Sequence, residues 1–496
     1  MNVSDLADLS IADAAAGLRS GDFTSVELLE AVTRRASVTE AQLHSYLTLD
    51  AEGARRAAGA ADAAFAAGED RGPLQGIPLA LKDNMCTIGV ETTAASQILA
   101  GWKPPYDATV VKRLRAGGAV LTGKTNLDEF AMGSSTENSA FGETRNPWNP
   151  RYVPGGSSGG SAATVAVGSA FGSFGSDTGG SIRQPAALCG VVGMKPTYGL
   201  VSRYGLIAFA SSLDQIGPFS RSVADSATLL DAIAGWDRFD STSIEGEVPN
   251  LAGSLDKGVS GLRIGVVTEL MGEGIDPQVK AAVSSMIASL EGAGAEIVDI
   301  SLPSTEYALS AYYLIAPAEC SANLARFDGV RYGHRSSSEG TTEDMMSLTR
   351  AEGFGPEVIR RILLGTYALS AGYYDAFYGQ AQRVRTLVRN DFASAYGDVD
   401  VLVSPTSPTT AFPVGERAAD PIAMYYSDVC TIPSNLSGDP AISVPVGLDD
   451  KGLPIGFQIM APALGEEMMY QVAGAVEQLA AFTARPELAS SEVVAP

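Results

Sequence analysis

Short apolar runs alternate with longer helix-forming stretches along most of the chain. Residues 77–81 form such a run and end in two charges, Lys82 and Asp83, which is typical of a short buried strand. Similar runs predict further strands, and the last two of them predict a hairpin, at 119–122, 262–267, 295–300, 399–403, 441–446 and 455–460. Because strands alternate with helices throughout, the pattern predicts an α/β fold.

The helix-forming stretches have apolar residues at helical spacing or a composition that favours helix. They include an alanine-rich stretch and are predicted at 4–68, 109–116, 160–168, 223–234, 277–292, 305–395 and 466–482. The polar, acidic residues 237–260 predict an exposed loop. No long linker or internal repeat divides the chain, so one large domain over 1–496 is favoured.

The charge balance limits which partners the chain can bind by itself. Its 496 residues carry 57 acidic and 34 basic side chains, a formal charge of −23. Such an acidic surface repels phosphate groups, so the chain alone is not expected to bind nucleic acid. Membership of an assembly whose other components bind nucleic acid stays open.

Cysteine usage and the amino terminus predict a reduced, cytoplasmic chain. The four cysteines, Cys86, Cys189, Cys320 and Cys430, lie far apart and form no CxxC motif. Cys86 and Cys189 are interpreted as packing residues. Residues 1–5 lack the basic and apolar regions of a signal peptide, and no apolar run of 18 residues predicts a transmembrane helix.

Residues 155–181 hold nine glycines and seven serines, which leaves few side chains large enough to build a core. Glycines allow close approach of backbone N–H groups to a ligand, and serines among them are candidate nucleophiles. Apolar residues at 162–167 and 182–189 interrupt the pattern, so the segment is not a flexible linker.

Two motif matches fail for lack of context. Residues 118–125 match a phosphate-binding loop, but an apolar, strand-like triplet lies between the glycines and acidic residues follow. Residues 155–159 match the nucleophile elbow of α/β-hydrolases, which also needs an acid and a histidine downstream. The chain has only His44, within a predicted helical stretch 41–50, and His334, in a polar turn. Both are interpreted as structural or surface residues.

Without a credible histidine, another base must activate a serine, and a neutral lysine can do so. Lys82 is the candidate, because the apolar run before it would carry it to the end of a buried strand. Burial would lower its pKa from the usual value of about 10.4.

Lys82, the motif at 155–161 and the motif at 175–186 together resemble the signature of the amidase signature family. Ser157 lies 75 residues after Lys82, and Ser181 lies 24 after Ser157. The resemblance implies a Ser-cis-Ser-Lys triad in which Ser181 is the nucleophile, Ser157 follows a cis peptide bond and transfers the proton, and Lys82 is the base. Backbone N–H groups of Thr178, Gly179 and Gly180 would form the oxyanion hole. Ser158, Ser161 and Ser176 are interpreted as structural.

The resemblance also implies a fold: one domain with a mixed central sheet and helices on both faces. Within it, 1–68 would form amino-terminal helices and 72–235 the signature core. Residues 262–484 would complete the substrate pocket.

Later segments, including 126–139, 326–333, 360–370 and 427–435, resemble the branch of the family that serves tRNA-dependent amidotransferases. This branch implies a glutaminase whose ammonia goes to a partner. Tyr312, Arg361 and Asp428 match its glutamine-binding positions, and the arginine and aspartate would bind the α-carboxylate and α-ammonium.

The same branch implies a heterotrimer with companion subunits B and C. It implies no cofactor in this chain, with ATP and Mg²⁺ used by a partner that also binds most of the aminoacyl-tRNA. Two alternatives stay open at this point: a stand-alone amidase acting on small or acyl amides, and a non-catalytic scaffold. An intact set of Lys82, Ser157 and Ser181 argues against the scaffold.

Overall fold

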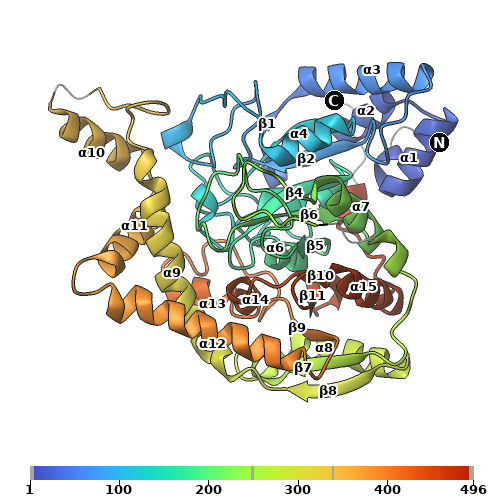
Figure 1. Cartoon of the computed structure of the whole chain (residues 1–496). Helices are drawn as coiled ribbons and strands as arrows, with labels where there is room; N and C mark the ends of the chain where they lie inside the picture. Colours follow the sequence, from blue (N-terminus) through green and yellow to red (C-terminus); the bar gives the residue numbers. More distant parts are fainter. Residues whose placement is uncertain (1–4, 247–250, 338–339, 491–496) are drawn as a thin grey trace.

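The computed structural model describes residues 5–246, 251–337 and 340–490, and its strands form one mixed sheet (Figure 1). The sheet has eleven strands in the order β1-β3-β2-β4-β6-β5-β10-β11-β9-β7-β8. The strands are β1 (Tyr46–Leu49), β2 (Pro78–Lys82), β3 (Val120–Thr125), β4 (Gly172–Asp177), β5 (Val192–Lys195), β6 (Gln215–Ser220), β7 (Arg263–Val267), β8 (Glu296–Ile300), β9 (Val401–Pro405), β10 (Ala441–Leu448) and β11 (Pro454–Met460). The expected mixed sheet is confirmed.

Helices cover both faces of this sheet. They are α1 (Ile11–Ser20), α2 (Ser25–Leu43), α3 (Ala51–Ala66), α4 (Thr109–Ala116), α5 (Gly159–Val167), α6 (Arg183–Cys189), α7 (Val223–Ile233), α8 (Pro277–Gly292), α9 (Ala308–Asn323), α10 (Thr342–Gly353), α11 (Pro356–Leu369), α12 (Gln380–Ala395), α13 (Pro421–Tyr426), α14 (Ile432–Ser437) and α15 (Glu466–Ala480). In the described part of the chain, none is both long and apolar enough to cross a membrane.

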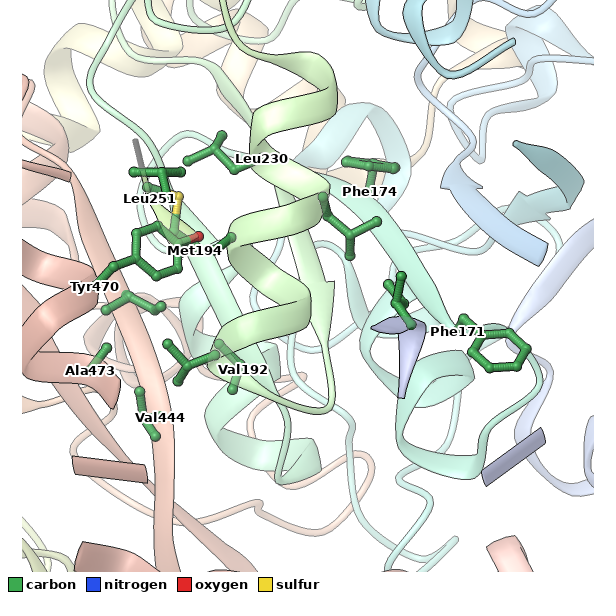
Figure 2. Packing of buried hydrophobic residues seen from close by; sticks show 14 of the residues in the cluster. Phe171, Phe174, Val192, Met194, Leu230, Leu251, Val444, Tyr470 and Ala473 are labelled. Carbon is green, nitrogen blue, oxygen red and sulfur yellow. The ribbon is translucent and has the colours of Figure 1, made fainter. Parts of the chain in front are cut away.

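Alternating side chains of the strands build two cores, one on each face. On β9, Val401 and Val403 enter a first core under α7, α8 and α15, whereas Leu402 enters a second core with α9, α12 and α14. Figure 2 shows the first core around α7, where Leu230, Met194 and Tyr470 pack together. The two cores hold the sheet rigidly between the layers.

Three neighbouring strands, β3, β2 and β4, run parallel. Their carboxyl ends therefore meet at one edge of the sheet, and Thr125, Lys82 and Asp177 are the last residues of the three strands. In sheets with parallel strands this edge is where ligands usually bind. The topology thus brings Lys82 next to the end of the glycine- and serine-rich segment.

The structure corrects two predictions about local structure. The stretch 41–50 is not helical throughout: α2 ends at Leu43, His44 is a left-handed cap, and β1 follows by pairing with β3. Residues 237–260 are not an exposed loop throughout. Leu251 is buried in the first core beside Met194 and Tyr470, since its apolar side chain fills space between α7 and α15 (Figure 2).

The stretch 305–395 is mostly helical, as predicted, but 327–337 are not helical. The remaining predicted strands and helices agree with the structure to within a few residues, and the predicted hairpin is β10 and β11, an antiparallel pair. Four expectations involve residues outside the described part of the chain. These residues are 1–4 of the stretch without a signal peptide pattern, 247–250 of the expected loop, 338–339 of the predicted helical stretch and 491–496 of the expected domain.

Candidate active site

Lys82 lies at the centre of a buried cluster of serine hydroxyls. Its Nζ donates hydrogen bonds to the Oγ atoms of Ser157 and Ser158, both at 2.8 Å, and of Ser176 at 3.0 Å. Strand alternation explains its direction, because Leu81 enters the first core and the next side chain must point to the opposite face. The lysine is fully buried.

The environment of Lys82 brings the pKa of its side chain close to neutral pH. Burial lowers the pKa of its ammonium group to about 7, although the carboxylates of Asp128, Asp177 and Asp214 act in the opposite direction. Near pH 7, about half of the molecules therefore carry a neutral amine at this position. A neutral amine beside serine hydroxyls can accept a proton.

The turn before α5 sets the positions of two of these serines. The peptide bond between Gly156 and Ser157 is cis, as the resemblance implied, and α5 begins directly after Ser158. Close packing requires a glycine opposite Ser158, because a Cβ added at Gly175 would lie 2.8 Å from the Ser158 Oγ. Strand β4 and the turn before α5 can therefore pack this closely against each other only because residue 175 is a glycine.

Ser181 follows the sharp turn after β4, and 8% of its surface is exposed. Asp177 holds that turn by accepting hydrogen bonds from the Gly180 N–H at 2.8 Å and the Ile182 N–H at 3.2 Å. Burial opposes the charge on Asp177, but the Arg183 guanidinium beside it lowers the pKa of this carboxyl to about 2. The turn thus rests on a permanently charged, buried ion pair.

The backbone donors of this turn are not equivalent. The N–H groups of Gly179 and Ser181 make no hydrogen bond within the described residues, while that of Gly180 is occupied by Asp177. The Thr178 side chain donates to Asp214 at 2.7 Å. Two of the neighbouring donors, Gly179 and Ser181, are therefore available to a ligand.

Tyr312 of α9 lies directly against this turn. A Cβ added at Gly179 would lie 2.7 Å from the Tyr312 Cζ, so the ring and the turn are in close contact. The ring is buried, with 4% exposed. Of the three expected glutamine-binding residues, Tyr312 is placed beside the candidate nucleophile.

Asp428 has one carboxylate oxygen without a partner. Its Oδ2 accepts a hydrogen bond from the Ser134 hydroxyl, while its Oδ1 is buried and has no partner within the described residues. Burial raises the pKa of this carboxyl to about 7. A buried unpaired oxygen is costly, and a cationic ligand group would satisfy it.

Arg361 of α11 is held among aromatic rings. Its Nε donates to Glu357 at 2.8 Å, and its guanidinium lies 5.1 Å from the ring centroids of Tyr313 and Tyr425. The side chain is buried, with 3% exposed. Its charge is thus partly balanced, and its position is fixed by packing.

A family model described as Amidase matches residues 27–470. The chain belongs to the amidase family. Two amidase relatives that cover nearly the whole chain are each named as the A subunit of glutamyl-tRNA(Gln) amidotransferase. That from Salinispora arenicola is 56% identical and covers 96% of this chain and 98% of its own length; that from Acidothermus cellulolyticus is 57% identical and covers 96% and 95%.

Solved amidase structures have the same fold. The A subunit of glutamyl-tRNA(Gln) amidotransferase from Thermotoga maritima superposes with a TM-score of 0.80 at 39% identity, covering 96% of this chain and 95% of that one. A peptide amidase from Stenotrophomonas maltophilia has a TM-score of 0.82 at 33% identity and covers 97% and 98%. The amidase fold predicted from the sequence is therefore confirmed.

Sequence reasoning missed several polar residues of the amidase site. Ser158 and Ser176 are structural residues in the sequence interpretation, yet both hydroxyls contact Lys82. Asn84 donates to the Ser176 Oγ at 2.9 Å. Asp128 and Asp214 are buried carboxylates whose pKa burial raises to about 6. Ser158 and Ser176 lie within the motifs 155–161 and 175–186, and the run 126–139 includes Asp128, but no local pattern points to Asn84 or Asp214.

The two rejected motifs are also rejected by the structure. Residues 120–125 form β3, and the lysine of the apparent phosphate loop, Lys124, is buried in an ion pair with Asp83 at 2.9 Å. His334 contacts Glu352 on the surface, and the ring of His44 lies near the Glu143 carbonyl. Among the described residues no cluster of histidine, cysteine and carboxylates is arranged to hold a metal.

Proposed function

We propose that this amidase is the glutamine-hydrolysing component of a tRNA-dependent amidotransferase, equivalent to the A subunit of its relatives. The observation that carries the proposal is similarity over nearly the full length to relatives with that name. The site supports it chemically, because it combines a buried lysine whose pKa is about 7, serine hydroxyls, and a buried arginine and a buried aspartate whose charges interact.

In the proposed reaction, the Ser181 Oγ attacks the side-chain carbonyl carbon of glutamine. The hydroxyl proton passes to Ser157, whose own proton passes to neutral Lys82 across the 2.8 Å hydrogen bond. The C–N bond then breaks, the nitrogen takes up the proton from Lys82 through Ser157, and ammonia leaves. Water hydrolyses the resulting acyl-enzyme by the same route and releases glutamate.

Negative charge develops on the carbonyl oxygen during the attack. The N–H groups of Gly179 and Ser181 supply free donors for it, and loss of one such donor typically costs about 3–4 kcal/mol. Of the three oxyanion-hole donors expected from the sequence, we keep the N–H groups of Thr178 and Gly179 in the proposal. Gly180 would first have to release its hydrogen bond to Asp177.

The substrate is held by charges of opposite sign. The unpaired Oδ1 of Asp428 would accept the α-ammonium of glutamine, and the guanidinium of Arg361 would bind the α-carboxylate. Tyr312, in contact with the turn that carries Ser181, would orient the side-chain amide. A free amino acid is therefore favoured over an uncharged amide.

The ammonia is passed to companion subunits, which we propose are B and C in a heterotrimer. The partner uses ATP and Mg²⁺ to activate the side-chain carboxyl of Glu-tRNA(Gln), or of both Glu-tRNA(Gln) and Asp-tRNA(Asn), before ammonia replaces the activating group. The charge of −23 on this chain fits an arrangement in which tRNA binds mainly elsewhere. We place the reaction in the cytoplasm.

One alternative is a stand-alone amidase, which the likeness to the peptide amidase favours. The two functions differ in their substrates and partners. A stand-alone amidase would hydrolyse peptide or small amides at full rate without companions and would not bind them.

Glutamine hydrolysis by the chain alone and with companion subunits, ATP and aminoacyl-tRNA tests the proposal. Ser181→Ala should abolish ammonia release and leave thermal unfolding unchanged. Ser173→Ala is the matched control: it lies in the same segment, and its Oγ has no partner within the described residues, so its activity should equal that of the wild type. Ammonia release by Ser181→Ala would rule out the proposed nucleophile.

A further inference from the structure

Helix α11 and the turn after it carry a group of large apolar side chains that are exposed. The exposed fractions are 64% for Leu363, 48% for Leu364, 51% for Tyr367, 43% for Tyr373 and 48% for Tyr374. Together with Ile359 of the same helix these residues are called the tyrosine face. In Figure 1, α11 lies at the outer margin of the molecule.

The tyrosine face is continuous. Ile359, Leu363 and Tyr367 follow each other at a spacing of four residues on α11, so they form one stripe. The ring of Tyr367 continues the stripe onto the turn, because its centroid lies 4.6 Å from that of Tyr373 and 5.8 Å from that of Phe377. The exposed rings are thus packed against one another in a fixed arrangement.

The opposite side of α11, in contrast, is buried. Gly365 packs so closely on α9 that an added Cβ would lie 1.9 Å from the Pro317 carbonyl oxygen, and the candidate substrate-binding residue Arg361 is buried. When a helix has apolar residues both on its core-facing side and on its outer side, it is usually covered on both sides. Something outside this chain is therefore expected to cover the tyrosine face.

The near absence of charge indicates which kind of molecule covers the tyrosine face. Residues 362–374 contain no charged side chain, although 18% of the whole chain is charged, and the neighbouring Arg360 is paired with Glu357. Nucleic acid binding needs cations for phosphates, so this face does not fit RNA. Exposed tyrosines without charges are typical of the centre of a protein–protein interface.

The exposed area is large enough for specific binding. If a fully exposed large side chain offers about 200 Å², the six residues of the tyrosine face expose on the order of 600 Å². A standard interface buries about 800 Å² per partner, and the largest apolar patch of a monomer is usually about 300–600 Å². The tyrosine face therefore exposes most of the area that one partner buries in a standard interface.

We propose that the tyrosine face is the docking surface for a companion subunit of the amidotransferase, through an apolar surface with few charges. This proposal rests on the proposed function. Because Arg361 lies on the inner side of the same helix, docking also restrains the residue expected to bind the α-carboxylate of glutamine. Assembly therefore lowers the KM for glutamine.

The test uses the full chain with its B and C subunits from the same organism. Leu363→Glu and Tyr367→Glu each place a charge in the interface and should weaken assembly at least about tenfold. Leu479→Glu is the matched control, since Leu479 is 42% exposed on α15, which Figure 1 places on the other side of the molecule. Assembly is measured by titration and gel filtration, with thermal unfolding of each variant as the check on folding.

Assembly of Leu363→Glu and Tyr367→Glu equal to that of Leu479→Glu would overturn the proposal. So would an isolated wild-type chain that is a dimer and becomes a monomer on Leu363→Glu, because the occupant would then be a second copy. A loss of tRNA binding by the isolated variant would overturn it as well. If the wild type hydrolyses glutamine and binds both companions while the variants assemble normally, the proposed function stands and only the docking surface fails.

Discussion

At the scale of the residue, Lys82 combines a basic amine with a site that disfavours its charge. Burial lowers its pKa to about 7, and three serine hydroxyls remain to hold the neutral amine in place. Reactivity is therefore available near neutral pH without a histidine. The rate of glutamine hydrolysis should report this titration directly.

The value of kcat is expected to fall about tenfold per pH unit below pH 7, because only the neutral form of Lys82 accepts the proton. Above pH 7 it should be constant. Stopped or continuous ammonia assays between pH 5 and pH 9 measure this profile. Lys82→Arg should lower kcat by about 100- to 10,000-fold at every pH, since a guanidinium is no base in this range. A kcat that does not change between pH 5 and pH 7 would exclude Lys82 as the base.

Asp428 should add a second titration, but only in the free enzyme. Its pKa is raised to about 7 by burial, and glutamine binding supplies an ammonium that keeps it ionised. Below pH 7, log kcat/KM should therefore fall with a slope near two, whereas log kcat falls with a slope near one. Asp428→Asn should reduce the first slope to one and raise KM about 10- to 100-fold, the loss of a hydrogen bond between charged groups. An unchanged slope in Asp428→Asn would contradict the assignment.

At this scale, the position of a site residue could be predicted only where the neighbouring sequence indicates it. Lys82 follows an apolar run, so its place at the end of a buried strand was foreseeable. The contact of its Nζ with Ser176 joins residues 94 positions apart and depends on the packing of β2 against β4. Asp214 reaches Thr178 from a loop without any motif. Such contacts are set by strand order, which a single sequence does not display.

At the scale of the element, α11 is positioned by a single small residue. Gly365→Ala would drive a Cβ into the Pro317 carbonyl of α9 and force the two helices apart. We expect a loss of about 1–3 kcal/mol in the free energy of unfolding and a higher KM for glutamine, since Arg361 moves with the helix. Urea denaturation and kinetics measure the two effects.

Gly59→Ala is the control for this prediction. Gly59 lies inside α3, and an added Cβ there meets nothing within 4 Å. Alanine in a helix interior is favoured over glycine by about 1 kcal/mol, so this variant should be as stable as the wild type or more stable. If Gly365→Ala were equally harmless, the close packing of α11 on α9 would not position Arg361.

Helices and strands were predicted correctly where the pattern of apolar residues lies within the element itself. They were missed where a strand forms only by pairing with a segment far away in the sequence. Helix α8 was predicted with its observed bounds, because Pro277 begins it and its apolar residues repeat at helical spacing. Strand β1 was predicted as helix because its four residues are extended only by pairing with β3. Leu251 was assigned to a loop whose polar neighbours concealed one buried side chain.

At the scale of the whole molecule, many carboxyl groups are buried and hold protons that an unfolded chain would release. Burial raises the pKa of Asp128 and Asp214 to about 6 and of Glu129 and Asp428 to about 7. Between pH 5 and pH 7 the folded state therefore binds more protons than the unfolded state. Folding stability must fall as the pH rises through this window.

We expect the free energy of unfolding to decrease by on the order of a few kcal/mol from pH 5 to pH 7. Above pH 7 these carboxyls are ionised in both states, and the lowered pKa values of Lys82 and Lys195 should make the free energy of unfolding rise again with pH, because the unfolded chain then binds more protons. Denaturant titrations at fixed ionic strength measure it, and Asp428→Asn should make the decrease smaller. A stability that increases from pH 5 to pH 7 would show that these carboxyls are ionised in the folded state.

The separation along the chain between the proposed proton-carrying groups and the proposed substrate-binding groups has a consequence for how the protein can evolve. The groups proposed to carry protons come from segments 78–82 and 155–181, whereas Tyr312 belongs to the second core and Arg361 and Asp428 come from elements beside it. Exchange of Tyr312, Arg361 or Asp428 would therefore alter which amide is accepted and leave Lys82, Ser157 and Ser181 in place. Selectivity and reactivity can then evolve at different rates, because they depend on different segments of the chain.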